Sequence, residues 1–240
     1  MRSSRWHAHG NVYLLVEDER LTPERARELS RSHVTDGILE VISVDVNEAE
    51  IAIWNPDGSQ AEMSGNGTRI AARWLAETSG CDDVIVRVGP RDVHARVHGD
   101  DVEQELGVVD VGKPEVVEGV ELVRVSVGNP HAVVRGDPDD IETIGPLLER
   151  HPRFPGGTNV QVARVDGPGR VSARVWERGV GETRSSGTSA VAVAAATHGD
   201  GEVVVSFPGG DVLVVLAEGR ARLRGPASRR DRAPEAPGSG

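Results

Sequence analysis

Two short serine–glycine segments stand out because an apolar stretch of helical length follows each of them. Ser64-Gly65-Asn66-Gly67 precedes the stretch Thr68–Glu77, and Ser186-Gly187-Thr188-Ser189 precedes the Ala- and Val-rich stretch Ala190–Thr197. The first turn of a helix leaves N–H groups without partners and carries a partial positive charge. Small residues let a ligand approach this backbone closely, so each segment predicts a place where an anion such as a carboxylate binds.

The two segments lie about 120 positions apart, which is half the chain, and they occupy the same point in a repeated series of elements. Each half contains several strand-like runs, then the serine–glycine segment, then an apolar helix, then two more strands. One residue at each helix entry would therefore approach a ligand from opposite sides. A single segment of this kind is more often an ordinary glycine-rich helix start, but the matched pair favours a binding site.

The elements that must position these segments are mostly strands. Runs rich in Val and Ile, bounded by Gly, Asp, Asn or Pro, predict strands over Asn11–Val16, Leu39–Val44, Ala49–Trp54, Val84–Val88, His94–Val97, Val123–Val127, Ala132–Val134, Val160–Val165, Arg170–Trp176, Val203–Phe207 and Asp211–Leu216. Helices are predicted over Thr22–Arg31, Thr68–Glu77, Asp139–Leu148 and Thr188–Thr197. The first of these opens with a Thr N-cap and a Pro at its first position.

Two similar α+β halves related by a pseudo-twofold axis are the simplest architecture that fits this pattern. We place the domains at residues 1–112 and 113–224, with Gly112-Lys113-Pro114 as the junction and residues 225–240 as a return segment. The stretch Ser228–Gly240 is charged and rich in Pro, Gly and Ala, so it is predicted to be a disordered tail.

Composition excludes several classes of protein. The chain has 240 residues, of which 38% are hydrophobic and 27% charged, as in a globular protein. Its net charge of −11 argues against nucleic acid as a partner, because phosphate binding needs a basic face. The single cysteine, Cys81, excludes an intrachain disulfide framework and a multi-cysteine metal site. No signal peptide or transmembrane stretch is evident, so we expect a cytoplasmic protein without a membrane partner.

Several motifs together resemble a known enzyme family. Residues 63–69, Met-Ser-Gly-Asn-Gly-Thr-Arg, resemble the Met-Cys-Gly-Asn-Gly-x-Arg signature of diaminopimelate epimerases. Residues 177–188 resemble their second signature, which normally has Ala-Cys-Gly-Thr near its end. Other family landmarks follow in order at His9-Gly10-Asn11, Asp36-Gly37, Asn55-Pro56-Asp57-Gly58-Ser59, Gly128-Asn129-Pro130-His131, Gly157-Thr158-Asn159-Val160 and Gly225-Pro226-Ala227.

This resemblance implies two pseudo-symmetric α+β domains, each a mixed sheet around a central helix, with the active site in the cleft between them. Family members remove an α-proton with one cysteine and return a proton from the other face with a second, without pyridoxal phosphate or metal. By position, Ser64 and Ser186 occupy these two places, and His131 and Glu177 are the other implied catalytic residues. The implied substrate-binding residues are Asn11, Asn55, Gly65, Asn66, Asn129, Asn159, Arg178, Gly187 and Thr188. The implied partner is a small amino dicarboxylate, with a homodimer as the family expectation and no cofactor.

Serine at both cysteine positions leaves the chemistry open. A thiol has a pKa of about 8.5 that a helix N-terminus lowers, whereas a serine hydroxyl needs an adjacent base before it can accept a proton. The first hypothesis is an epimerase that interconverts L,L- and meso-diaminopimelate, with His131, Glu177 or an activated serine moving the proton. The second is a binding or regulatory protein that holds the ligand without turnover. The third is a cofactor-independent racemase or dehydratase that acts on another amino acid.

Overall fold

The computed structural model describes residues 1–230, and the chain divides into two compact units with separate hydrophobic cores. Unit 1 comprises Met1–Val102 and the segment that begins at Pro226, and unit 2 comprises Glu103–Gly225. This boundary falls within strand β8, Asp101–Val108, whereas the sequence placed it after residue 112. The Gly-Lys-Pro segment interpreted as the junction lies inside strand β9, Asp110–Val117, because β9 pairs with the next strand of unit 2.

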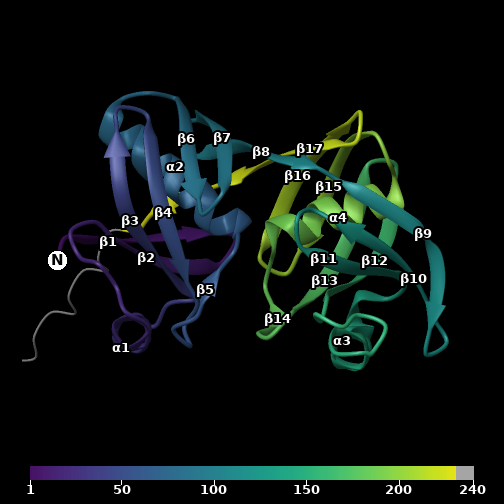
Figure 1. The fold of residues 1–240 in the computed structure, drawn as a ribbon. Coiled ribbons are helices and arrows are strands. Elements are labelled where there is room, and N and C mark those ends of the chain that lie inside the picture. Colours follow the sequence, from purple (N-terminus) through teal and green to yellow (C-terminus); the bar gives the residue numbers. More distant parts are fainter. Residues whose placement is uncertain (231–240) are drawn as a thin grey trace, which may run out of the picture. The chain divides into compact units, whose positions relative to one another are not determined.

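Unit 1 is a mixed sheet with two helices (Figure 1). Its elements are β1 Ser3–Ala8, β2 Asn11–Val16, α1 Pro23–His33, β3 Gly37–Asp45, β4 Glu48–Trp54, β5 Gln60–Ala61, α2 Gly65–Ser79, β6 Asp83–Val88, β7 Arg91–His98 and β18 Ser228–Arg229. Strand β2 runs parallel to β3 and antiparallel to β1, and β4 runs parallel to β6 and antiparallel to β3. The parallel pairs are possible because α1 and α2 provide the crossovers.

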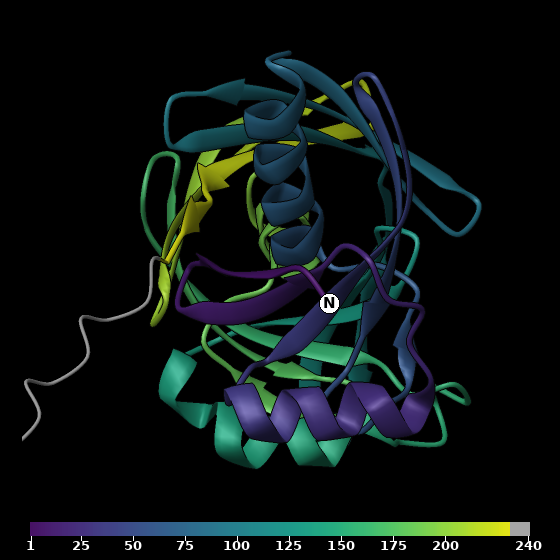
Figure 2. The ribbon, with the colours of Figure 1, turned by 90° about the vertical axis from the view of Figure 1, so that its left-hand side faces the viewer.

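The helix predictions in unit 1 are confirmed, with small shifts in their ends. Helix α1 has Thr22 as its N-cap, and the Thr22 hydroxyl accepts a hydrogen bond from the backbone N–H of Arg25. Helix α2 begins at Gly65, so the whole Gly-Asn-Gly segment forms its first turn. Ile70 and Leu75 are fully buried, and each such side chain contributes about 1.5–3 kcal/mol to folding. Figure 2 shows α2 inside the curved strands of unit 1.

Unit 2 repeats the same order of elements (Figure 1). After β8 and β9 come β10 Val120–Ser126, β11 Pro130–Arg135, the 3-10 turn Pro138–Asp140, α3 Ile141–Glu149, β12 Asn159–Gly167, β13 Arg170–Glu177, β14 Gly181–Thr183, α4 Gly187–Thr197, β15 Gly201–Phe207, β16 Gly210–Ala217 and β17 Arg220–Pro226. Strands β11 and β12 are parallel, as are β13 and β15. These pairings match β2–β3 and β4–β6 of unit 1, so the repeat predicted from the sequence is confirmed.

Helix α4 forms the centre of unit 2, as α2 does in unit 1. The residues from Gly187 to Ala194 are all buried, and the stretch Ala190–Thr197 consists of Ala and Val up to its final Thr. A helix that is apolar on every side needs strands on every side, and small side chains let those strands approach closely. The expected arrangement of a mixed sheet around a central helix therefore holds in each unit.

The disordered tail was predicted to begin at Ser228, which is too early, because a further strand follows there. Ser228 and Arg229 form strand β18, which pairs with β1 opposite His7 and Trp6. The hydroxyl of Ser228 lies 2.7 Å from Nε2 of His7, and the backbone N–H of Arg230 donates to the carbonyl of Arg5. The rest of the predicted tail, residues 231–240, lies outside the described residues.

Candidate functional site

In unit 1 the site is built on the first turn of α2, where Ser64 is the N-cap residue. Its backbone is extended, with φ −142° and ψ 117°, and its hydroxyl accepts a hydrogen bond of 3.1 Å from the backbone N–H of Gly67. Gly65 and Asn66 follow as buried residues of the first turn. The serine hydroxyl thus lies at the positive end of the helix dipole, where negative charge is stabilised.

Behind this turn lies a buried cation. Arg69 is fully buried, and its Nη2 donates to Oδ1 of Asn66 and lies 2.9 Å from Nδ1 of His9. Burial lowers the pKa of Arg69 to about 10, so the guanidinium stays charged near neutral pH. Within residues 1–230, its Nε and Nη1 atoms have no hydrogen-bond partner. A positive charge without full compensation therefore stands close to the start of α2.

Tyr13 is a site residue that sequence reasoning missed. Its side chain is 7% exposed, and its hydroxyl lies 3.0 Å from Oγ of Ser64. The available signal was its place in Gly10-Asn11-Val12-Tyr13, which has the same order as Gly128-Asn129-Pro130-His131 in the second half.

Of the three predicted asparagines of unit 1, Asn66 belongs to the first turn of α2, whereas Asn11 and Asn55 lie in or next to other turns. Asn11 is half-buried at the start of β2, directly after the β1–β2 turn. The amide of Asn55 donates to Oγ of Ser59, and its backbone N–H donates to the carbonyl of the same residue. These hydrogen bonds of Asn55 lie within its own turn and do not reach Ser64. Such a turn is a common use of asparagine, so the structure gives Asn55 a backbone role.

In unit 2 the equivalent N-cap is Ser186, at the start of α4. Its φ of −147° and ψ of 129° match those of Ser64, and it is 7% exposed. Its side chain makes no capping hydrogen bond, unlike that of Ser64. Gly187 and Thr188 are buried in the first turn of α4. The two helix starts share their backbone geometry but differ in what holds the serine hydroxyl.

His131 is held in a chain of hydrogen bonds that leads to this turn. Its Nε2 lies 2.9 Å from Oδ1 of Asn129, and its Nδ1 lies 3.0 Å from Nε2 of Gln161. Gln161 Nε2 also donates to Oγ of Ser189 in α4, and Asn129 Nδ2 donates to Oγ1 of Thr188. Because the Gln161 amide donates to Nδ1, the proton of the neutral ring lies on Nε2 and is donated to Asn129.

Burial lowers the pKa of His131 to about 3. The hydrogen bond with Gln161 acts in the opposite direction, and repulsion by Arg178 adds to the lowering. The imidazole is therefore neutral near pH 7 and accepts a proton poorly. Gln161 and Ser189 were not predicted; the available signal was a polar residue at a fully buried position of the apolar strand β12.

Asn159 and Arg178 are in contact at the turn between β13 and β14 of unit 2. Oδ1 of Asn159 accepts a hydrogen bond from the backbone N–H of Arg178, and its Nδ2 donates to the carbonyl of Pro130. The carboxylate of Glu149 accepts from the backbone N–H of Gly179 and from Nε1 of the Trp176 indole. These contacts hold the turn between β13 and β14, which carries Glu177 and Arg178.

Glu177 is a predicted catalytic residue, and its pKa is raised above the ordinary value of a glutamate. Burial of its carboxyl group raises the pKa of Glu177, while the hydrogen bond that it accepts from the hydroxyl of Thr183 acts in the opposite direction. A carboxyl group with a raised pKa is better matched to general acid–base catalysis than an exposed one.

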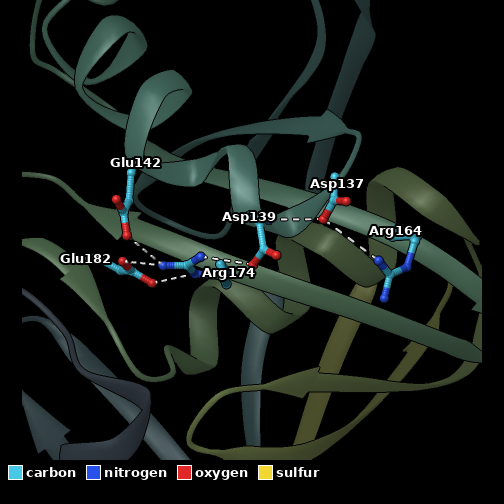
Figure 3. A network of polar contacts seen from close by, with 6 residues as sticks. All are labelled: Asp137, Asp139, Glu142, Arg164, Arg174 and Glu182. Atoms are coloured by element: carbon cyan, nitrogen blue, oxygen red, sulfur yellow. Dashed lines mark hydrogen bonds and ion pairs between the residues drawn. The ribbon is translucent and has the colours of Figure 1, made fainter.

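Strand β14, which carries Thr183, is fixed by a polar network (Figure 3). Arg174 contacts both carboxylate oxygens of Glu182 on β14, and it also contacts Asp139 and Glu142 beside the start of α3. Asp137 accepts from the backbone N–H of Asp139 and forms an ion pair with Arg164. Arg174 therefore ties β13, β14 and the start of α3 together.

The structure therefore gathers the predicted residues into two groups. Ser64, Gly65 and Asn66 lie together in unit 1, joined by the unpredicted Tyr13 and Arg69. In unit 2, Asn129, His131 and Thr188 are linked at the start of α4, next to Ser186 and Gly187, and Asn159, Glu177 and Arg178 lie at the β13–β14 turn. Over residues 1–230, no cluster of three or more His, Cys, Asp or Glu side chains is suited to hold a metal ion.

Cys81 is separate from these groups. It follows the end of α2, is half-buried, and packs against the core of unit 1. None of the helices in the described part of the chain is long and apolar enough to cross a membrane.

Comparison with known proteins places this geometry in a family. The sequence matches the family model for diaminopimelate epimerase over residues 4–117 and 123–229. It is 36% identical to the diaminopimelate epimerase of Corynebacterium glutamicum, with 92% of this chain and 93% of that protein covered. It is 33% identical to the diaminopimelate epimerase of Desulfitobacterium hafniense, with 95% of each covered. The fold resembles a predicted epimerase from Pseudomonas aeruginosa with a TM-score of 0.73 at 15% identity, over 96% of this chain and 97% of that one.

Proposed function

Because the chain belongs to the diaminopimelate epimerase family, a family of racemase- and epimerase-type isomerases, we propose that it inverts the α-carbon of an amino dicarboxylate. The pair that it interconverts is L,L- and meso-diaminopimelate. The observation that carries this proposal is the repeated helix start, in which a serine with the same extended backbone caps a buried glycine-led helix in both units.

Inversion at an α-carbon needs one group that removes a proton and another that delivers a proton to the opposite face. We assign one such group to each unit, Ser64 to unit 1 and Ser186 to unit 2. The α-carboxylate binds at the backbone of the helix starts, because helix N-termini attract anions. Negative charge that develops on the substrate as the proton leaves is stabilised by the same dipoles.

The roles of the remaining site residues follow from their charges and hydrogen bonds. Arg178 carries the positive charge suited to the distal carboxylate, with Asn159 holding the backbone of its turn. Glu177 is a further acid–base residue of unit 2, in addition to Ser186, since burial raises its pKa. His131 stays neutral and orients the amide of Asn129 through the hydrogen bond from its Nε2. Neither residue needs a cofactor or a metal for these roles.

The test is incubation of the purified protein with L,L-diaminopimelate in D2O, followed by proton NMR and chiral chromatography. We expect the α-proton signal to decay as the meso isomer appears. Ser64→Ala and Ser186→Ala variants should each lose exchange while still binding the ligand in calorimetry. Binding without any exchange over many hours would refute the epimerase and leave a binding protein; exchange with a different amino acid alone would refute the assigned substrate.

A contaminating cysteine-dependent epimerase from the expression host is the main alternative source of activity. Iodoacetamide distinguishes the two, because the chain has one cysteine and it lies outside both groups of site residues. Activity of this protein should survive alkylation, and the Cys81→Ser variant should be as active as the wild type. Ser64→Cys and Ser186→Cys variants should exchange faster and become sensitive to iodoacetamide, since a thiol is the more acidic group.

A further inference from the structure

We propose that Tyr13 is the proton-transfer partner of Ser64, so that in unit 1 a serine–tyrosine pair does the work of one acid–base group. This inference rests on the proposed function and extends it. Serine alone is a poor base, because its hydroxyl must give up its own proton before it can usefully take another. Tyr13 supplies the acceptor for that proton.

The contact geometry fits this role. The Tyr13 hydroxyl lies 3.0 Å from Oγ of Ser64, and Oγ already accepts a hydrogen bond from the backbone N–H of Gly67. The serine proton is then available to be donated to the Tyr13 oxygen. The tyrosine ring is held by β3, where a Cβ atom added to Gly37 would lie 2.6 Å from its Cε1. The phenol is therefore fixed in position rather than free to rotate into solvent.

Two opposing effects act on a Tyr13 phenolate, because burial of the ring disfavours the charged form whereas the positive charge of Arg69 favours it. Arg69 interacts electrostatically with Tyr13 and with Asp101, and two of its nitrogen atoms have no hydrogen-bond partner in the described part of the chain. A buried guanidinium stabilises a nearby anion much more than an exposed one does. The other titratable groups facing this region are His9, which contacts Arg69 from the β1–β2 turn, and Asp101 from β8. Asp101 is negative and also interacts with Arg69, so it offsets part of the positive charge that would stabilise a Tyr13 phenolate.

The repeat in the fold supports the assignment independently. Tyr13 follows Gly-Asn-x at the start of β2, and His131 follows Gly-Asn-x at the start of β11. Each is paired with the first residue of the next parallel strand, Gly37 in β3 and Asn159 in β12. The two units thus place a titratable ring at the same position of their matching parallel strand pairs. In unit 2 that ring is the histidine that the family motif contains, and in unit 1 it is Tyr13.

The proposed step balances without any added reactant. Ser64 Oγ takes the substrate α-proton while its own proton passes to the Tyr13 phenolate, and the electron pair of the C–H bond stays on the α-carbon. The serine ends as a hydroxyl, the tyrosine as a phenol, and the negative charge has moved from the phenolate to the substrate. In the reverse direction the phenol returns the proton through Ser64.

The kinetic test compares Tyr13→Phe in two backgrounds. With Ser64 present, loss of the phenol should slow α-proton exchange by about 100-fold or more, the usual contribution of an acid–base group. In the Ser64→Cys background the same change should have little effect, because the thiol ionises without help. Equal losses in both backgrounds, or no loss with Ser64, would overturn the proposal. Ser30→Ala, which removes a buried hydroxyl without a hydrogen-bond partner on α1, is the matched control and should leave exchange unchanged.

A second test needs no substrate, so it separates this proposal from the proposed function. Tyr13 is the single tyrosine of the chain, and tyrosinate absorbance near 295 nm therefore reports on it alone. We expect its ionisation midpoint to lie at least about one pH unit below the ordinary value of about 10, and to rise in Arg69→Met but not in Arg69→Lys. A midpoint at or above the ordinary value in the wild type would overturn the phenolate. A low midpoint in a protein without exchange would leave the pair intact and remove only the epimerase.

Discussion

Replacing His131 by glutamine removes a ring that the unfolded chain protonates but the folded chain keeps neutral. Burial among Asn129, Gln161 and the neighbouring strands lowers the pKa of His131 from 6.5 to about 3. The unfolded state therefore binds one more proton than the folded state between these two pH values. Stability that depends on this residue is present above about pH 6.5 and is lost as the pH falls toward about 3.

The size of the effect follows from the shift. Each pH unit between the two pKa values is worth about 1.4 kcal/mol, so acidification from pH 7 to pH 5 should cost about 2 kcal/mol through His131 alone. Glutamine does not titrate, so the variant escapes this cost. It loses a constant amount from altered packing and hydrogen bonds, and that constant cancels when the two pH values are compared.

The assay is urea unfolding of the wild type and of His131→Gln at pH 7 and pH 5. The difference in unfolding free energy between the two proteins should move by about 2 kcal/mol in favour of the variant at the lower pH. Val133→Ala, a cavity-forming change on the same strand, is the control and should show the same difference at both pH values. Parallel behaviour of wild type and His131→Gln would refute the buried, neutral histidine.

Three further changes test other parts of unit 2. Gly145→Ala should destabilise the protein by about 1–3 kcal/mol in urea unfolding, because the new Cβ would lie 2.7 Å from Cβ and Cγ of Trp176; a neutral result would contradict the packing of α3 on β13. Glu149→Ala should lower the free energy of unfolding by about 1.5–3 kcal/mol, since the N–H of Gly179 and the indole of Trp176 lose a charged acceptor. The same change should weaken ligand binding in calorimetry, and an unchanged affinity would show that the turn between β13 and β14 is not needed for binding. Glu177→Gln should raise the melting temperature more at pH 8 than at pH 4, because stability tied to a raised carboxyl pKa is lost as the pH rises; an equal change at both pH values would argue against the buried carboxyl group.

Local sequence signals predicted the helices of this protein well. Thr22 and Pro23 mark the start of α1, and the serine–glycine segments mark the starts of α2 and α4, because caps and small residues act within one turn of the chain. The strands built from runs of Val and Ile were also predicted, since such runs bounded by turn residues need no distant information, whereas β1, β8 and β17 were missed although each has buried residues. Strand β9 was missed because all but two of its residues are exposed and it carries no apolar alternation.

The candidate site was predicted only in part. Ser64, Ser186 and His131 were identified as site residues from motifs that occur in a fixed order along the chain, and that order is itself sequence information. The hydrogen-bond partners of those residues were not predicted. Gln161 donates to His131 across a pair of parallel strands, and Glu149 reaches the β13–β14 turn from the end of α3. In the sequence Gln161 shows only as a polar residue within the apolar run of β12, and the contact of Glu149 leaves no trace in local periodicity.

The sequence by itself therefore determined the kinds of element, their repeated order and the residues at each helix start. Tertiary structure alone decided which side chains meet. Tyr13 and Ser64 are separated by 51 positions and His7 and Ser228 by 221, yet each pair is in hydrogen-bond contact. Helix caps and strand patterns report interactions within a few residues, whereas strand pairing and burial bring together groups that only the folded chain holds close, and the acidity of Glu177, His131 and Arg69 depends on that burial.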